Sequence, residues 1–536
     1  MTEKKQILKS ASVITLVTIA SRIFGYVRDQ RITLLLGTSQ LADSFVLAYR
    51  IPNLLRRLVA EGAMTAAFIP VFTSHLAEKP KEEVWAFANR LFWTMAALLA
   101  AIAVLGVIFS PALVHFFTSL NPTHSTQWDR AIELNRIIFP YIFFIGLAAL
   151  AMAILNSFHI FGLPAATPIL LNISIIVFSI GAVWNYFGDP AVALAVGVLV
   201  GGALQFLVQV PALVRQGMRF NFDISFKDPG VRSVGRLMVP VFLGGAVYQI
   251  NIFIDTIFAT SAKMPEGSLS SLYVADRVME LVLGGYAIAV ATAILPMMAH
   301  QAAAHDFEAM KRTFAFSLRI VSFITIPAMV GLIVMRQPII SVLFQHGEFS
   351  SVSTDLTANA LLYYAIGLPA FAGVKLIVPA FYSSQDTRTP VRVAIYALAL
   401  NIGLNLLFLK TFFQTFTNGG PAFATSLSAY FNFFALFVIF RRRFGRLGTL
   451  EILVSLAKVS VCSVAMGGLC WVMLNYTGFE SFQSLWLRIG VFTLMIVLAT
   501  VFFVALAWAM RCAEVDEVYG IAARREVAGK TVPGRK

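Results

Sequence analysis

Long apolar segments recur along the whole chain and limit its fold more than any other feature. Of its 536 residues, 58% are hydrophobic and 13% are charged, against about 45–50% and 25% in soluble domains. About 20 apolar residues are enough to cross a bilayer as a helix. The sequence therefore predicts an all-α polytopic membrane protein with about 14 transmembrane helices. They fall at residues 10–36, 41–76, 84–113, 130–157, 163–187, 190–215, 233–262, 269–300, 310–335, 354–383, 390–413, 420–440, 450–475 and 485–511.

Basic residues fall mainly between these segments and predominantly on one side of the membrane. The formal net charge of +14 would suggest nucleic acid in a soluble protein, but the positive-inside rule accounts for it here, and we expect no nucleic-acid partner. The same rule predicts a cytoplasmic location for both termini. The residues on this side are the N-terminal lysines, Lys79, Lys81, Arg215, Arg219, Lys227, Arg232, Arg236, Lys311, Arg312, Arg388, Arg392, Arg441–Arg443, Arg446 and the C-terminal tail.

Two halves of the chain share short motifs in the same order. Pro70 and Pro296 end the second and eighth segments in similar contexts, and Thr167-Pro168 with Asn172 resembles Thr389-Pro390 with Asn401. Because equivalent segments are six apart, the halves run in the same direction, as in transporters built from parallel repeats. We predict two six-helix lobes, then two further helices and a basic cytoplasmic tail. The boundaries are 1–216, 217–443, 444–512 and 513–536, and residues 336–353 form a loop with a half-buried apolar piece at 339–344.

Several arginines interrupt the first two segments. Arg22 and Arg28 lie in the first segment beside Asp29, and Arg50, Arg56 and Arg57 lie in the second. A guanidinium at the bilayer centre costs roughly 2.5–3.5 kcal/mol on insertion scales, so these side chains are expected to face a polar cavity. A cluster of fixed cations there suggests an anionic cargo. Arginine matches phosphate oxygens bidentately, which favours a diphosphate.

Some of these charges have a second interpretation, which is internal ion pairing between helices. Asp43, Arg50 and Arg57 repeat every seven residues, and Glu61 follows four residues later, so they either pair with one another or contact cargo. For Arg22, Arg28, Arg56 and Arg277 we favour cargo contact, with Asp29 and Glu280 orienting the arginines or competing for them. Asp276 belongs to the cluster around Arg277, and Lys375 lies alone in the tenth segment.

Three polar residues elsewhere suggest a cation site. Asp255 lies in the seventh segment away from the arginines, and Asn401 and Asn405 share one face of the eleventh. Their oxygens can bind a monovalent cation such as sodium, or the three residues serve as interhelical hydrogen-bond partners. We expect no other cofactor and no catalytic residue, because no nucleotide-binding motif or metalloenzyme motif appears.

These residues together resemble the MurJ (MviN) family of lipid II flippases, within the multidrug/oligosaccharidyl-lipid/polysaccharide exporter superfamily. The likeness rests on Ser21-Arg22, Gly25, Arg28-Asp29, Ala42-Asp43, Pro52 to Arg57, Glu61-Gly62-Ala63, Ala275-Asp276-Arg277, Glu280, Leu343-Phe344, Gly347, Phe349, Phe381-Tyr382-Ser383, Gln385-Asp386 and Thr389-Pro390. It extends to about the twelfth segment. Arg50 stands where many members have lysine, and Asn405 where relatives have aspartate.

The resemblance implies two lobes around a cationic cavity lined by Arg22, Arg28, Asp29, Arg56 and Arg277, and a lipid-tail groove in the last two helices. The implied cargo is undecaprenyl-diphosphate carrying the peptidoglycan precursor, moved across the bacterial inner membrane by alternating access. Membrane lipids and cell-wall synthesis proteins are further expected partners. The alternatives are a related lipid-linked oligosaccharide flippase, a cation-coupled exporter and, from another class, a membrane-embedded glycosyltransferase.

Overall fold

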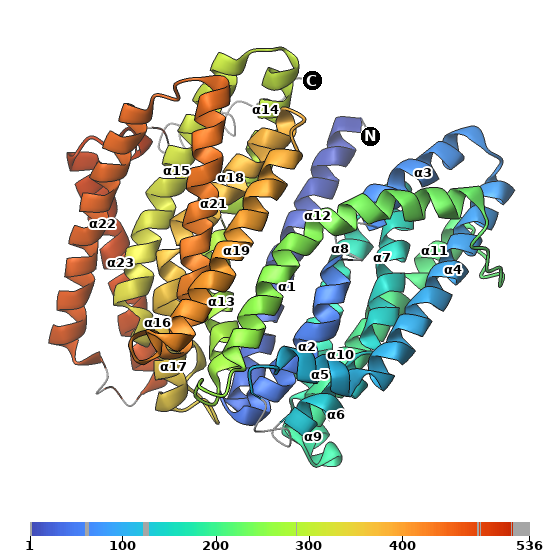
Figure 1. Ribbon diagram of the computed structural model, residues 1–536, viewed down its shortest axis with the longest axis horizontal. Helices are drawn as coiled ribbons and strands as arrows, with labels where there is room; N and C mark the ends of the chain where they lie inside the picture. Colours follow the sequence, from blue (N-terminus) through green and yellow to red (C-terminus); the bar gives the residue numbers. More distant parts are fainter. Residues whose placement is uncertain are drawn as a thin grey trace, which may run out of the picture. The chain divides into compact units, whose positions relative to one another are not determined.

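The computed structural model describes residues 3–58, 64–121, 128–285, 287–479, 482, 484–515 and 517, and their regular secondary structure is helical (Figure 1). Every predicted membrane segment coincides with one helix or with two consecutive helices. Eight helices in the described part are long and apolar enough to cross a membrane, or ten if two bent pairs count as single spans. The all-helical, multi-span architecture is thus confirmed, and the full number of fourteen stays a prediction.

The chain divides into two compact units. The first comprises Met1–Ser270 with His346–Ser353, and the second comprises Ser271–Gln345 with Thr354–Lys536. The first contains α1 Glu3–Leu36, α2 Gln40–Leu58, α3 Met64–Glu78, α4 Lys81–Ile108, α5 Ser110–Phe117, α6 Asp129–Ile138, α7 Tyr141–Ser157, α8 Gly162–Phe178, α9 Gly181–Phe187, α10 Pro190–Leu207, α11 Val210–Gln216 and α12 Pro229–Ala259.

Two helices, α13 Ser268–Gly285 and α17 Ser351–Ile366, begin in the first unit and continue in the second. The remaining helices of the second unit are α14 Ala287–Ala303, α15 Phe307–Val334, α16 Arg336–Phe344, α18 Leu368–Ser383, α19 Arg388–Lys410, α20 Phe413–Phe416, a 3-10 turn at Thr417–Gly419, α21 Gly420–Phe444, α22 Thr449–Thr477 and α23 Leu485–Ala509. The predicted boundaries at 216 and 443, which follow the internal repeat, stay a prediction.

Each unit has its own apolar core. In the first unit, one cluster joins α3, α4 and α7 to the start of α12, and a second joins α2, α6, α8 and α10. In the second unit, α22 and α23 pack against α15 through residues such as Phe323, Val459 and Phe503. Burial of these apolar side chains fixes the helices that carry the polar residues described below.

The structure corrects the expectation of a loop at residues 336–353. Residues Arg336–Phe344 form α16, whose Ile340 and Phe344 are almost fully buried. The apolar piece is thus a helix, although its buried residues, Pro338, Ile340, Val342 and Phe344, alternate along the sequence as they would in a strand. The following residues, His346–Ser353, belong to the first unit.

Candidate substrate-binding site

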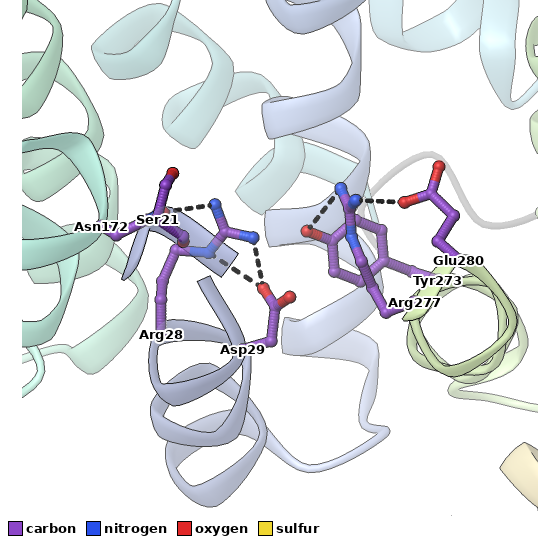
Figure 2. A network of polar contacts seen from close by, with 7 residues as sticks. All are labelled: Ser21, Arg28, Asp29, Asn172, Tyr273, Arg277 and Glu280. Carbon is purple, nitrogen blue, oxygen red and sulfur yellow. Dashed lines mark hydrogen bonds and ion pairs between the residues drawn. The ribbon is translucent and has the colours of Figure 1, made fainter. Parts of the chain in front are cut away.

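Arg28 and Asp29 form the most deeply buried charged pair of the predicted site. Both lie in the last third of α1 and are only 9% and 7% exposed. Arg28 donates from Nε at 2.9 Å and from Nη2 at 2.6 Å to Oδ1 of Asp29, and from Nη1 at 3.0 Å to Oδ1 of Asn172 in α8 (Figure 2). Asn172 in turn donates to the backbone carbonyl of Ser21 at 3.1 Å. The arginine is therefore held in one orientation by two helices.

This geometry decides what the arginine can do. Nε and Nη2 are the two donors on one edge of the guanidinium, and that edge is the one that binds carboxylate or phosphate bidentately. Asp29 occupies it here. A phosphate can take the same edge if Asp29 moves aside, while the bond to Asn172 keeps the guanidinium in place. The predicted role of Asp29 as a competitor for Arg28 fits this arrangement.

Two other arginines of α1 differ in their surroundings. Arg22 is exposed. Arg31 donates from Nε at 3.0 Å to the hydroxyl of Ser179 and from Nη2 at 2.8 Å to its backbone carbonyl. Ser179 is the residue at which α8 ends before the chain bends by 74° into α9. Arg31 thus satisfies a carbonyl at a broken helix end, where a membrane offers no water to do so.

Asp43, in the first turn of α2, is bound by residues at the start of a different helix. The Asp43 carboxylate accepts hydrogen bonds from the backbone N–H of Gly267 at 3.0 Å and from the N–H and hydroxyl of Ser270, both at 2.7 Å. These residues begin α13, so Asp43 compensates the N–H groups of a helix start. Arg50 donates to the hydroxyl of Thr256 in α12 at 2.9 Å.

The end of α2 carries the remaining arginines of the second segment. Arg56 donates from Nε at 2.7 Å to Oδ1 of Asn53, one turn earlier on the same helix. Arg57 is half-buried. Glu61, the predicted partner of Arg57, lies outside the described residues.

Backbone contacts around Asp43 join three distant loops of the first unit. Gly37, Gly267 and Gly347 all have positive φ angles, and a Cβ on them would overlap the backbone of Glu348, Thr38 and Leu34, respectively. Only glycine allows both that conformation and that close approach. The N–H of Glu348 also donates to the carbonyl of Leu34 at 2.9 Å. We call the meeting of these loops with Asp43 the glycine junction.

The second unit presents a comparable group on α13. Arg277 donates from Nη1 at 2.7 Å to Glu280, and from Nη2 at 3.4 Å to the hydroxyl of Tyr273, whose ring centroid lies 4.9 Å from the guanidinium carbon (Figure 2). Arg277 and Glu280 are more exposed than the pair on α1, at 24% and 39% of their side chains. The neighbouring Asp276, and Lys375 in α18, are half-buried.

The proposed cation ligands lie in different surroundings. Asp255 is buried in α12 and accepts from the amide of Asn251 at 3.3 Å, and its chain neighbour Thr256 accepts from Arg50, so it is not remote from the arginines. Asn401 and Asn405 are buried in α19, where Asn405 donates to Asn401 and Asn401 donates to Thr425 of α21. Within the described residues no group of three histidine, cysteine or carboxylate side chains is placed to hold a metal. The monovalent-cation site stays a prediction.

Sequence reasoning missed the positioning residues rather than the arginines. The sequence singled out Asn172 only as part of the internal repeat. It did not single out Arg31, Ser179 or Tyr273. A polar side chain in an apolar segment was the available signal for Asn172. The others depend on which helices meet, and one sequence does not contain that information.

The comparisons with known proteins agree with this architecture. The family model described as "Lipid II flippase MurJ" matches residues 32–509. The chain is 37% identical over 447 residues to the probable lipid II flippase MurJ of Vibrio cholerae serotype O1, covering 82% of this chain and 83% of that protein.

Solved structures point the same way. A structure described as lipid II flippase MurJ in an inward closed conformation aligns with a TM-score of 0.75 and 26% identity, over 93% of this chain and 99% of the other. An inward-facing MATE family transporter of the MOP superfamily aligns with a TM-score of 0.65 over 78% of this chain and 94% of the other, and at 16% identity it shows only a shared fold. The chain belongs to the lipid II flippase MurJ family.

Proposed function

We infer that this chain is a lipid II flippase, a transporter rather than an enzyme. It moves the undecaprenyl-diphosphate-linked peptidoglycan precursor from the inner to the outer leaflet of the bacterial cytoplasmic membrane. Membership of the family over most of the chain supports the assignment. The structural observation that carries it is the buried Arg28, whose bidentate edge is held by the exchangeable carboxylate of Asp29.

In this proposal the diphosphate replaces carboxylates on prepositioned arginines. Arg28 exchanges Asp29 for a phosphate oxygen pair, and Arg277 of the second unit exchanges Glu280 in the same way. Because both arginines have intramolecular anionic partners, neither guanidinium is left uncompensated when cargo leaves. Arg22, Arg56, Arg57 and Lys375 add positive charge for the diphosphate and sugar-peptide headgroup. Asp276 helps to orient Arg277.

Other charged residues of the predicted site serve the transport cycle instead. Asp43 and Arg50 hold α2 to α13 and α12, respectively, through the hydrogen bonds described above. Alternating access requires such contacts to break and re-form, since the arginines are open to one leaflet at a time. We therefore assign Asp43 and Arg50 to the control of access rather than to direct contact with lipid II. Glu61 keeps its predicted role as a partner of Arg57.

Two further elements complete the proposal. The face formed by α22 and α23 accommodates the polyprenyl tail, in keeping with the apolar exposed residues of these helices, such as Leu453, Val464 and Val501. Both termini lie in the cytoplasm. A diphosphate leaving a negative cytoplasm gains about 2.3 kcal/mol per charge per 100 mV, so the membrane potential favours export.

The experiment is complementation of a strain depleted of its own lipid II flippase. We expect the wild type and the exposed-arginine control Arg441→Ala to restore growth. Arg28→Ala and Arg277→Ala are expected to fail although they are made and inserted. An inserted wild type that does not restore growth would remove the lipid II assignment. Rescue by both arginine variants would instead contradict the diphosphate-binding role of these residues.

A further inference from the structure

Residues 218–228 connect α11 to α12 without regular secondary structure, and we call this segment the strap. Arg90 of α4 binds two of its carboxylates, Asp223 at 2.9 Å and Asp228 at 3.0 Å. The backbone N–H of Ser225 donates to the hydroxyl of Thr94, also in α4, at 3.1 Å. The strap is therefore fastened along one flank of α4 by polar contacts.

Its apolar side chains occur at every second position, at Phe220, Phe222, Ile224 and Phe226. Phe220 packs edge-on against Phe92 with ring centroids 5.1 Å apart. The next three remain exposed, Phe222 to 74%, Ile224 to 40% and Phe226 to 59%. Phe222 also contacts Trp93 of α4 edge-on, with ring centroids 5.0 Å apart, so part of its ring is covered. Three large apolar side chains that remain this exposed are costly in water.

In the same region the carboxylates are paired, whereas the basic side chains remain exposed. Both carboxylates of the strap are paired with Arg90, whereas Arg219 and Lys227 of the strap are exposed. The first turns of α12 continue the pattern. Val231 and Val234 are buried in the core formed with α3 and α4, and Arg232 and Arg236 are exposed one turn apart.

Exposed aromatic and aliphatic side chains interleaved with lysine and arginine are typical of segments that lie in the headgroup region of a membrane. We propose that the strap and the first turns of α12 dock on anionic phospholipid headgroups, with Phe222, Ile224 and Phe226 inserted between them. The cations at Arg219, Lys227, Arg232 and Arg236 bind the lipid phosphates. This site is separate from the arginines that bind cargo and does not depend on the flippase assignment.

The test places a spin label at the exposed Asn221, as Asn221→Cys, in the full-length protein. The native cysteines Cys462, Cys470 and Cys512 are buried. The protein is reconstituted in nanodiscs of phosphatidylcholine alone or with phosphatidylglycerol added. Collisions of the label with oxygen, which dissolves in lipid, and with a water-soluble nickel chelate measure its depth. We expect a shift toward lipid contact in the anionic discs only.

Two variants and a control separate charge from apolar contact. Each basic residue near an anionic surface strengthens binding by about fivefold, so Arg219→Gln/Lys227→Gln/Arg232→Gln/Arg236→Gln is expected to abolish the shift. Phe222→Ser/Phe226→Ser is expected to leave the label in water. Arg441→Gln/Arg442→Gln/Arg446→Gln, which removes exposed arginines elsewhere, is expected to keep the shift.

The remaining outcomes contradict the proposal. A label that stays in water in both kinds of nanodisc would exclude docking on lipid. The same result is expected if the partner of the strap is an acidic protein, because the nanodiscs contain no such protein. Equal lipid contact in neutral and anionic discs, or a shift that survives in the quadruple variant, would exclude recognition of the anionic headgroup.

Discussion

A buried guanidinium is tolerated only when its N–H groups have partners, and Arg28 meets that demand with one carboxylate and one amide. Asp29 and Asn172 play different parts. The Asp29 carboxylate neutralises the charge of Arg28, and the Asn172 amide of α8 fixes the orientation of its guanidinium group. The ion pair can therefore be exchanged for a phosphate without loss of orientation.

The Arg28–Asp29 pair gives a prediction for stability as well as transport. Arg28→Ala leaves the Asp29 carboxylate buried without its main cation, which is expected to destabilise the protein by about 3–5 kcal/mol. The double variant Arg28→Ala/Asp29→Asn is expected to recover part of that loss but no transport. Thermal unfolding of the purified variants, beside a transport assay, makes the comparison. Recovery of transport by the double variant would contradict the role of Arg28.

Asp386, in the turn between α18 and α19, gives a prediction for pH. Burial opposes its ionisation, but hydrogen bonds from the backbone N–H and hydroxyl of Thr389 and the charge of Arg443 outweigh burial and hold its pKa below the usual value. A lowered folded-state pKa stabilises the protein above the unfolded pKa of about 3.9, and this contribution is lost as pH falls through the folded value.

We therefore expect Asp386→Asn to be less stable than the wild type at neutral pH. The difference should begin to narrow as the pH falls below about 4, the unfolded-state pKa, and should disappear below the lowered folded-state pKa, where the wild-type carboxylate is also neutral. Melting curves at several pH values measure this. A difference that stays constant down to acidic pH would contradict the assigned contacts.

The sequence singled out the arginines of the proposed site, but it did not indicate their hydrogen-bond partners. The arginines of α1 and α2 stand out because charge in an apolar segment is unusual. The seven-residue spacing of Asp43, Arg50 and Arg57 suggested pairing along one helix, yet Asp43 binds the start of α13 and Arg50 binds Thr256. Periodicity shows which residues share a face, but not what that face meets.

At the scale of elements, broken helices and close backbone contacts matter most. The bend of 74° between α8 and α9 leaves a helix end that Arg31 satisfies. Composition predicted an apolar segment at 163–187, but it could not give the break. The same limit applies at α16, where nine residues expected in a loop form a half-buried helix.

The glycine junction provides a matched pair of substitutions. Gly267 and Gly188 have similar φ angles of +80° and +70°, but a Cβ on Gly267 would overlap Thr38, whereas one on Gly188 would meet no described atom within 4 Å. Gly188→Ala is expected to lower the free energy of unfolding by only about 1–2 kcal/mol, the cost of a left-handed backbone conformation at alanine. Gly267→Ala is expected to lower the free energy of unfolding by clearly more than Gly188→Ala does, and to impair transport. Equal melting temperatures of the two variants would contradict the close packing of the junction.

For the whole molecule, the positive-inside bias predicts which loops face which compartment. Tyr186 in α9 and Lys227 in the strap are both exposed and are separated by the spanning helix Pro190–Gln216. A membrane-impermeant thiol reagent is expected to label Tyr186→Cys in intact spheroplasts, and Lys227→Cys only after permeabilisation. The opposite pattern would reverse the assigned orientation and, with it, the direction of export.

Hydrophobicity alone located the long helices of the described residues, since each predicted segment corresponds to one helix or a consecutive pair, but it did not locate the short helix α16. The division into compact units at Ser270, with His346–Ser353 joined to the first, was not predictable in the same way. It depends on contacts such as those of Gly347 with Leu34, which leave no periodic pattern in the sequence.

The most direct measurement is translocation of fluorescent lipid II in proteoliposomes containing the wild type, Arg28→Lys or Arg28→Ala. Lysine keeps the charge but cannot bind Asn172 and a phosphate pair at once. We predict transport by the wild type, at least a tenfold loss for Arg28→Lys, and none for Arg28→Ala, while Arg441→Ala transports normally. Full transport by Arg28→Ala would contradict the account that Arg28 binds the diphosphate.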